Sequence, residues 1–271
     1  MHAQQVLQAE LRRACPEIHS TRFRVLMDTV HAVTYSRCLS VTGLGRALPA
    51  TTTAKHNIKR VDRLTGNTHL DRESLALYTA LSHWLIGATE HPPILVDWSD
   101  LTTDRAWQLL RASLPCGGRA LTLYEEVHPL SQLANRQVHR RFLRALADVL
   151  PSDITPIVIT DAGFRSTWFH QVEALGWHWL GRIRGRDLVR FGPDADWVSC
   201  REIMAQARAR PQALGTVQIV RNRPTRCSLY RVRRAKKGRV SRTVFGVRAR
   251  SRHSEMNARR EREPWLLATS I

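Results

Sequence analysis

A chain of 271 residues with 43% hydrophobic side chains can form one large domain or two modest domains with buried cores, which excludes a disordered protein. Its formal net charge of +19 indicates an acidic polymer as partner. The excess is concentrated: residues 182–260 contain 22 Lys and Arg against 5 Asp and Glu. The arginine fork suits phosphate. A GC-rich genome could raise the arginine content without any function, but codon usage does not explain the clustering.

The cysteines argue against a metal or disulfide framework. Their number is odd, their spacings are wide and no C-x-x-C occurs, so the pattern fits a reducing compartment. The polar N-terminus lacks the apolar region of a signal peptide. The most apolar helical stretch, 75–88, is too short and too interrupted to span a bilayer. We therefore expect a cytoplasmic protein with no membrane partner.

Residues 1–90 are predicted to form a helical DNA-binding region. Apolar residues recur at helical spacing in three segments. They are Val6, Leu7, Leu11 and Ala14; Leu26, Val30 and Val33; and Leu77, Leu81, Trp84 and Leu85. Between the second and third segments, Thr51–Thr53 can cap a helix whose apolar face carries Ile58, Val61 and Leu64.

The remaining surface of that helix is crowded with cations: Lys55, His56, Lys59, Arg60 and Arg63. One interpretation is a solvated charged face. The other is a helix that lies against DNA and contacts base edges or phosphates.

Residues 91–185 change to alternating strands and helices. Strands are predicted at 94–97, 107–114, 119–127, 156–161 and 179–183, with helices from about 135 to 149 and around 168–175. This order predicts an α/β fold with a ribonuclease-H-like mixed sheet, in which three antiparallel strands precede parallel ones. The first and fourth strands are then neighbours.

Two of these strands are apolar runs that end in an aspartate, Asp97 and Asp161. Taken singly, an aspartate at a strand end is most often a cap or turn residue. On neighbouring strands, the two carboxylates could hold a divalent metal between them, which is an arrangement used for phosphoryl transfer.

Residues 186–260 are predicted to form an arginine-rich antiparallel β insertion. Strands are expected at 216–221, 227–233 and 239–248, with Lys236 and Lys237 in a hairpin loop. The two interpretations are a solvated, codon-biased sheet and a phosphate-binding surface. Residues 261–271 contain one more expected core strand, beginning at Trp265.

Taken in order, the 55–64 helix, Asp97-Trp98-Ser99, Thr160-Asp161-Ala162-Gly163-Phe164 and Trp265-Leu266-Leu267-Ala268-Thr269 resemble a known family. It is that of the bacterial cut-and-paste DDE transposases of the insertion-sequence-4 family. The likeness extends over essentially the whole chain, and it depends on the ordered set because no single motif is strong.

The resemblance implies a site in which two aspartates and one glutamate bind two Mg²⁺ ions, or Mn²⁺ in their place, with Asp97 and Asp161 as the aspartates. It implies cleavage at the ends of a DNA element and strand transfer to target DNA. The implied partners are double-stranded DNA, as terminal inverted repeats and target, and a second copy of the chain in a synaptic complex at the nucleoid. Trp265 stands where the family places a residue that stacks on a flipped base, and a core tryptophan is the alternative.

The sequence departs from the family in its third acidic residue. The family's glutamate lies on a helix after the last strand, and this sequence has no such helix. Glu255, Glu261 and Glu263 precede the Trp265 strand instead. We therefore expect a truncated transposase with an incomplete site, in which one of these glutamates would have to act as the third ligand.

Three other classes are considered. A non-catalytic remnant that binds or blocks transposon ends is favoured by the missing glutamate. A different ribonuclease-H-like nuclease, such as a resolvase, does not account for the N-terminal helices and the basic insertion. A ribosome-associated basic protein would seldom have a large alternating core.

Overall fold

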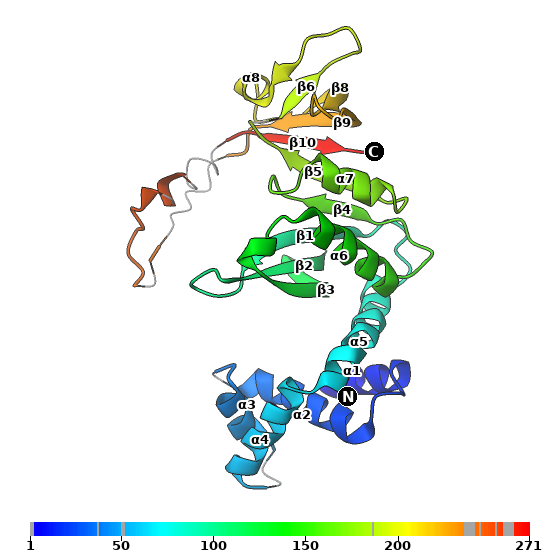
Figure 1. Ribbon diagram of the computed structural model, residues 1–271, viewed down its shortest axis with the longest axis vertical. Helices are drawn as coiled ribbons and strands as arrows, with labels where there is room; N and C mark the ends of the chain where they lie inside the picture. The colour runs from blue at the N-terminus through cyan, green and yellow to red at the C-terminus, as the bar shows by residue number, and fades with distance from the viewer. Residues whose placement is uncertain are drawn as a thin grey trace. The chain divides into compact units, whose positions relative to one another are not determined.

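The computed structural model describes residues 3–36, 38–49, 52–185, 187–235, 242–243, 245–252, 254–256 and 263–271 (Figure 1). The chain divides into two compact units. The first comprises Met1–Ala88 with Ala147–Ser152, and the second comprises Thr89–Leu146 with Asp153–Ile271. Among the helices of the described ranges, none has the length and apolar character needed to cross a membrane.

The first unit is helical. Its helices are α1 (Ala3–Ala14), α2 (Ser20–Tyr35), α3 (Val41–Ala47), α4 (Ala54–Thr65) and α5 (Thr68–Ile86). Short polar side chains begin three of them, because their oxygen atoms can accept hydrogen bonds from the free N–H groups of a first helical turn. The caps are Ser40 for α3, Thr53 for α4 and Asn67 for α5.

Two apolar clusters hold these helices together. The first contains Leu11, Cys15, Ile18, Phe23 and Met27, and the second contains Ala32, Leu48 and Val61. Helices α3 and α4 approach to near backbone contact, since a Cβ added at Gly45 would lie 2.5 Å from the Cα of Ile58. A residue larger than glycine would push these two helices apart.

The predicted inner face of α2 was wrong. Val30 and Val33 are 36% and 44% exposed. The buried apolar positions of α2 are Phe23, Met27 and Ala32. Phe23 and Met27 pack in the first cluster, and burying a large aromatic ring removes more apolar surface from water than burying a valine.

The second unit contains a ten-stranded mixed sheet with the order β3-β2-β1-β4-β5-β10-β9-β8-β6-β7 among the described residues. The core strands are β1 (Pro93–Asp100), β2 (Trp107–Cys116), β3 (Arg119–Pro129), β4 (Ile157–Thr160) and β5 (His178–Ile183). The first three form an antiparallel meander, and β1, β4 and β5 run parallel. The α/β class and the pairing of the first and fourth strands are therefore confirmed.

Helices α6 (Arg136–Val149) and α7 (Ser166–Glu173) cover one face of these strands (Figure 1). Phe169 of α7 stacks on Trp179 of β5 with ring centroids 4.1 Å apart. The same phenylalanine lies over Gly181, where an added Cβ would come within 2.4 Å of the ring. This face of the sheet is close-packed and aromatic.

The predicted insertion is part of the same sheet, because β10 pairs with β5 on one side and with β9 on the other. The remaining elements are β6 (Leu188–Arg190), β7 (Val198–Ser199), α8 (Cys200–Ala205), β8 (Gln212–Ile219), β9 (Thr225–Val232) and β10 (Trp265–Thr269). Where a third insertion strand was predicted at 239–248, the described residues show a single bridge between Arg242 and Arg248. The short strands β6 and β7 were not predicted.

Candidate metal centre and nucleic-acid surfaces

A row of charged residues crosses the strands of the second unit. Asp97 on β1 is opposite Arg111 on β2, which is opposite Glu125 on β3. In the other direction, Val96 pairs with Thr160 and Thr160 pairs with Gly181. The next residue after each of these three is Asp97 on β1, Asp161 directly after β4, and Arg182 on β5. These residues therefore occupy neighbouring positions across three parallel strands. The two predicted aspartates are neighbours, with Arg111 next to Asp97 on one side and Arg182 next to Asp161 on the other.

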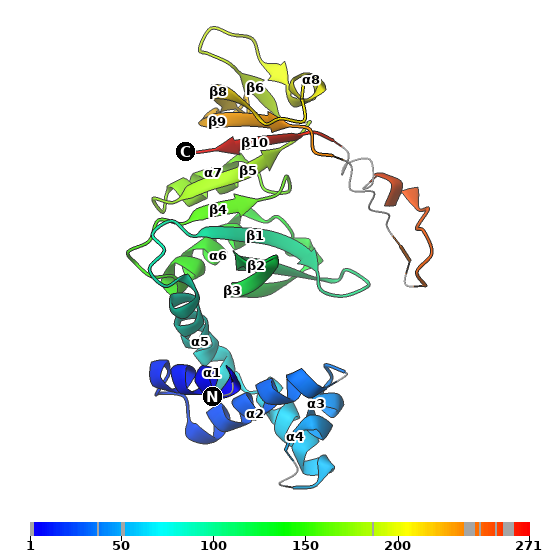
Figure 2. The same cartoon turned by 180° about the vertical axis from the view of Figure 1, so that it is seen from behind.

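The row lies on the face opposite α6 and α7. Side chains alternate along a strand: Ile94 and Val96 are buried, and so are Trp179 and Gly181 beneath α7, which places Asp97, Asp161 and Arg182 on the other face. Figure 2 shows that face of β1, β4 and β5, and no described helix of this unit lies across it. The charged row therefore lies on the face of these strands that no described helix of the unit covers.

The two carboxylates are close enough to interact electrostatically. The pKa of Asp97 is raised first by desolvation and then by the negative charge of Asp161, while the backbone N–H of Trp98 partly offsets the rise. Part of the Asp97 side chain still reaches solvent. The apolar residues Leu95 and Ile159 are half-buried on the same face of the sheet.

Asp161 is fixed by the turn that follows β4. Its Oδ1 accepts a hydrogen bond from the backbone N–H of Gly163 at 2.7 Å. A Cβ at Gly163 would lie 2.9 Å from that oxygen, so the tight turn favours glycine here. One carboxylate oxygen of Asp161 is thereby oriented by the backbone.

Arg182 has buried hydrogen-bond donors without acceptors among the described residues. Its Nε and one terminal nitrogen are buried and form no hydrogen bond to the described residues. Its pKa is lowered to about 10, first by desolvation and then by the charge of Arg184, with Glu263 and Asp161 acting in the opposite direction. A buried guanidinium without hydrogen-bond acceptors favours an incoming oxyanion.

Of the three candidate glutamates, the two that the structure describes do not complete a metal site with these aspartates. Glu263 lies beside Arg184, with Oε2 3.9 Å from the arginine Nε. Glu255 is exposed, and Glu261 lies outside the described residues. Within the described ranges, no group of three or more His, Cys, Asp and Glu side chains is arranged to hold a metal ion.

On the covered face, Trp98 anchors the backbone beside Asp97. Its indole N–H donates to Nε2 of His139 on α6 at 2.9 Å. His139 is 5% exposed, stacks on Phe164 and contacts Trp168 edge-on. Desolvation, helped by the charge of His128, lowers the pKa of His139 to about 4, so the ring is neutral and accepts the hydrogen bond at pH 7.

Helix α4 carries the predicted DNA-binding cations. Lys55, Lys59 and Arg63 are exposed and follow each other at four-residue spacing, so they form one strip along the helix. His56 is also exposed, and its Nδ1 lies 3.1 Å from the capping Thr53 hydroxyl. Arg60 differs from the others.

Arg60 points toward α2 instead of the strip. It forms an ion pair with Asp28 at 2.8 Å and donates to the Asn57 side chain at 3.2 Å. Much of its charge is therefore already balanced within the protein. The strip that remains available to a partner consists of Lys55, Lys59 and Arg63.

Trp265 begins β10 and is half-buried. The guanidinium carbons of Arg182 and Arg234 lie 5.1 and 4.8 Å from its ring centroid. Cation–π contacts of this kind hold the indole beside the charged row. Lys236 and Lys237, predicted in a DNA-binding hairpin loop, lie outside the described residues.

Sequence reasoning did not identify Arg111, Arg182 or the Trp98–His139 hydrogen bond. A signal for Arg182 was present, because a charged residue in the apolar run 179–183 must either face outward or have a partner. The Trp98–His139 pair joins residues 41 apart, and no sequence pattern indicates it.

No protein-family profile matches the chain, and comparison with curated proteins and with solved structures likewise found no match. The class that the structure itself defines is an α/β protein with a mixed sheet and a separate helical unit.

Proposed function

We propose that the chain is a DNA transposase with a ribonuclease-H-like core, which binds double-stranded DNA and carries out metal-dependent phosphodiester cleavage and strand transfer. The observation that carries this proposal is the parallel pairing of β1 with β4, which places Asp97 and Asp161 side by side on an open face. The pKa of Asp97 is raised first by desolvation and then by the charge of Asp161, and the second cause is expected for two neighbouring carboxylates that repel each other.

The donor set fits one divalent cation. Mg²⁺ prefers oxygen ligands and is commonly held by one or two carboxylates, with substrate phosphate and water as the other ligands. Asp97 and Asp161 supply two such carboxylates. A bound Mg²⁺ would act as a Lewis acid on the phosphate and lower the pKa of a coordinated water. A second ion would require a further acidic ligand.

The protein's own residues would orient the phosphodiester. Arg182 lies on the strand beside Asp161, and its positive charge would attract a non-bridging phosphate oxygen to this position. Arg111, opposite Asp97 in the strand register, forms an ion pair with Glu125 at 2.8 Å. In the reaction, a water or 3′-hydroxyl oxygen gives up its proton to solvent and forms a new bond to phosphorus. The opposite oxygen leaves with the electron pair of the broken P–O bond and takes up a proton from solvent.

DNA binding is assigned to the α4 strip. Lys55, Lys59 and Arg63 lie on one line of the helix and can follow a phosphate backbone or enter the major groove. Each cation that neutralises a phosphate adds about 0.9 to the slope of log affinity against log salt. We therefore expect Lys55→Ala with Lys59→Ala to lower that slope by about 1.8.

Cleavage is tested with duplexes taken from the DNA that flanks the gene, incubated with the full chain in Mg²⁺ or in EDTA. Asp97→Asn and Asp161→Asn are expected to abolish nicking while band shifts of the same duplexes stay unchanged. Asp100→Asn is the matched control, because Asp100 ends the same strand but accepts a hydrogen bond from Gln108 and pairs with Arg105. Metal-dependent nicking that survives Asp97→Asn would remove the catalytic assignment.

The second candidate is a non-catalytic protein that occupies transposon ends. It is favoured by the ion pair of Glu263 with Arg184 and by the absence, within the described ranges, of three acidic, histidine or cysteine side chains grouped to hold a metal ion. This function predicts salt-dependent band shifts that require Lys55 and Lys59, with no nicking in Mg²⁺ or Mn²⁺. Under either function, a homodimer that brings two DNA ends together remains a proposal, tested by the stoichiometry of the shifted complex.

A further inference from the structure

A large cavity opens within the helical unit, between α2, α4 and the turn that begins α5. Its volume is about 860 Å³. Basic side chains dominate its polar lining: His19, Arg22, Arg24, Arg60 and Arg63. Asp28 is the one carboxylate among the described lining residues.

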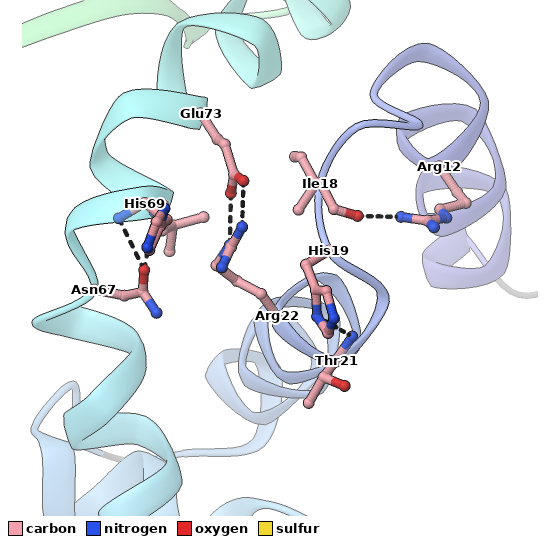
Figure 3. A network of polar contacts seen from close by, with 9 residues as sticks. Arg12, Ile18, His19, Thr21, Arg22, Asn67, His69 and Glu73 are labelled. Carbon is pink, nitrogen blue, oxygen red and sulfur yellow. Dashed lines mark hydrogen bonds and ion pairs between the residues drawn. The ribbon is translucent and has the colours of Figure 1, made fainter.

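Two of the arginines form the framework of the cavity. The Arg22 guanidinium forms two hydrogen bonds with the Glu73 carboxylate, and Figure 3 shows this fork joining α2 to α5. The pKa of Glu73 is lowered mainly by that pairing. Arg60 is held by Asp28 and Asn57. These ion pairs connect the three helices and fix the walls.

The other two arginines are not used in this way. Arg24 and Arg63 come from different helices and line the same cavity. Both are exposed, and neither forms an ion pair with a described residue. Guanidiniums that line a cavity and have no ion-pair partner among the described residues favour an incoming anion, and phosphate matches their donor geometry.

The cavity is also too large and too apolar for a phosphate alone. Val25, Pro49 and Leu64 contribute apolar lining. Its volume lies in the range of about 300–1,000 Å³ that is typical of small-molecule sites, in which a few polar groups orient a mostly apolar contact. A planar base and a sugar would fill the space beside the phosphate.

We propose that this cavity binds a nucleotide, with its phosphate on Arg24 and Arg63 and its base or sugar against Val25, Pro49 and Leu64. The nucleotide is either free or part of a DNA strand. Arg63 also belongs to the α4 strip, so a backbone that follows Lys55 and Lys59 reaches the cavity. Binding of a nucleotide within DNA rests on the proposed function. Binding of a free nucleotide does not, because Asp97 and Asp161 do not line the cavity.

Binding is measured on the full chain by calorimetry with AMP, and by fluorescence anisotropy with a labelled 20-base-pair duplex. The test variant is Arg24→Gln with Arg63→Gln. The control is Arg46→Gln with Arg72→Gln, which removes two exposed charges from the same unit outside the cavity. Thermal melts of both variants check that the helical unit stays folded.

The test variant is expected to weaken the binding of at least one probe tenfold or more, while the control changes it less than threefold. Loss of AMP binding identifies a site for free nucleotide. Loss of duplex binding alone identifies a nucleotide within DNA when Arg24→Gln by itself, which leaves the α4 strip intact, also weakens duplex binding. The proposal is overturned if wild type binds neither probe, or if the test and control variants weaken both probes equally. Asp97→Asn keeps the binding of both probes, so a failure of the cleavage assay leaves the cavity assignment standing.

Discussion

Neighbouring residues of the same strands have different environments on the two faces of the sheet. Val96, Thr160 and Gly181 lie on the face beneath α6 and α7, and the residues that follow them are Asp97, Asp161 and Arg182. A shift of one residue in strand register would bury three charges. The close packing of the covered face therefore fixes the position of the charged row on the open face. Residues that stabilise the fold lie on one face of the sheet, and the charged row lies on the other.

The largest expected effect is on the covered face. Trp179→Ala removes a fully buried indole that stacks on Phe169 and donates to Glu173 at 2.9 Å. We expect a loss of about 3–5 kcal/mol in the free energy of unfolding, measured by urea denaturation. Trp107→Ala is the control, because Trp107 is 47% exposed, and it should cost less than about 1 kcal/mol. Equal losses in the two variants would show that the covered face is not the close-packed one.

The next effect depends on pH. The folded-state pKa of His139 is about 4, below its ordinary value of 6.5. Its contribution to stability is full above pH 6.5 and is lost as the pH falls toward 4, because the unfolded chain takes up the proton first. A shift of this size corresponds to at most about 3 kcal/mol.

His139→Gln isolates this effect, because glutamine has no titrating group and can still accept a hydrogen bond from Trp98. Stability is compared between pH 7 and pH 4 for both proteins by chemical denaturation. The variant should lose less stability over this interval than wild type. An identical loss would show that His139 does not contribute to the acid sensitivity.

A smaller effect is expected for Gly181→Ala. The added methyl group would meet the Phe169 ring at 2.4 Å and push α7 away from β5. Overpacking of this kind destabilises by about 1–3 kcal/mol. Gly185→Ala on the same segment is the control, because an added Cβ there has no atom within 4 Å. Thermal melts of the two variants should differ clearly, and matching melting temperatures would contradict the packing described for Gly181.

The smallest effect has the opposite sign. Asp97→Asn removes a carboxylate whose pKa is raised by burial and by Asp161. A raised carboxyl pKa disfavours the folded state at neutral pH, so the variant should be more stable at pH 7 by up to about 0.5 kcal/mol. The gain should vanish in acid, where the wild-type carboxyl is protonated. A destabilised variant at pH 7 would contradict the repulsion between the two aspartates.

The pairing of the two strands that precede Asp97 and Asp161 could be predicted from the sequence, because it follows from the order of the strands. The apolar runs before Asp97 and Asp161 identified both strands, and the order of elements indicated that these strands pair, as they do. The burial of Phe23 in place of Val30 could not be predicted, because it depends on which helix packs against α2. The same holds for Arg60, whose partner Asp28 lies on another helix, 32 residues away.

For a similar reason, the sequence predicted the two aspartates of the charged row but not its arginines. Arg182 reaches its position because β5 pairs with β4 in one particular register, and a sequence pattern indicates a strand without giving its register. The continuity of the sheet through β10 was also not foreseen. It depends on residues 265–269 pairing with strands that lie far apart in the sequence.

Metal binding by Asp97 and Asp161 is the central claim, and Mn²⁺ titration of the full chain followed by electron paramagnetic resonance tests it most directly, without any DNA substrate. Wild type should bind one Mn²⁺ ion, which Mg²⁺ displaces, and both Asp97→Asn and Asp161→Asn should weaken that binding at least tenfold. Asp100→Asn should leave it unchanged. Equal Mn²⁺ affinity in wild type and Asp97→Asn would contradict the assignment of this pair as a metal site.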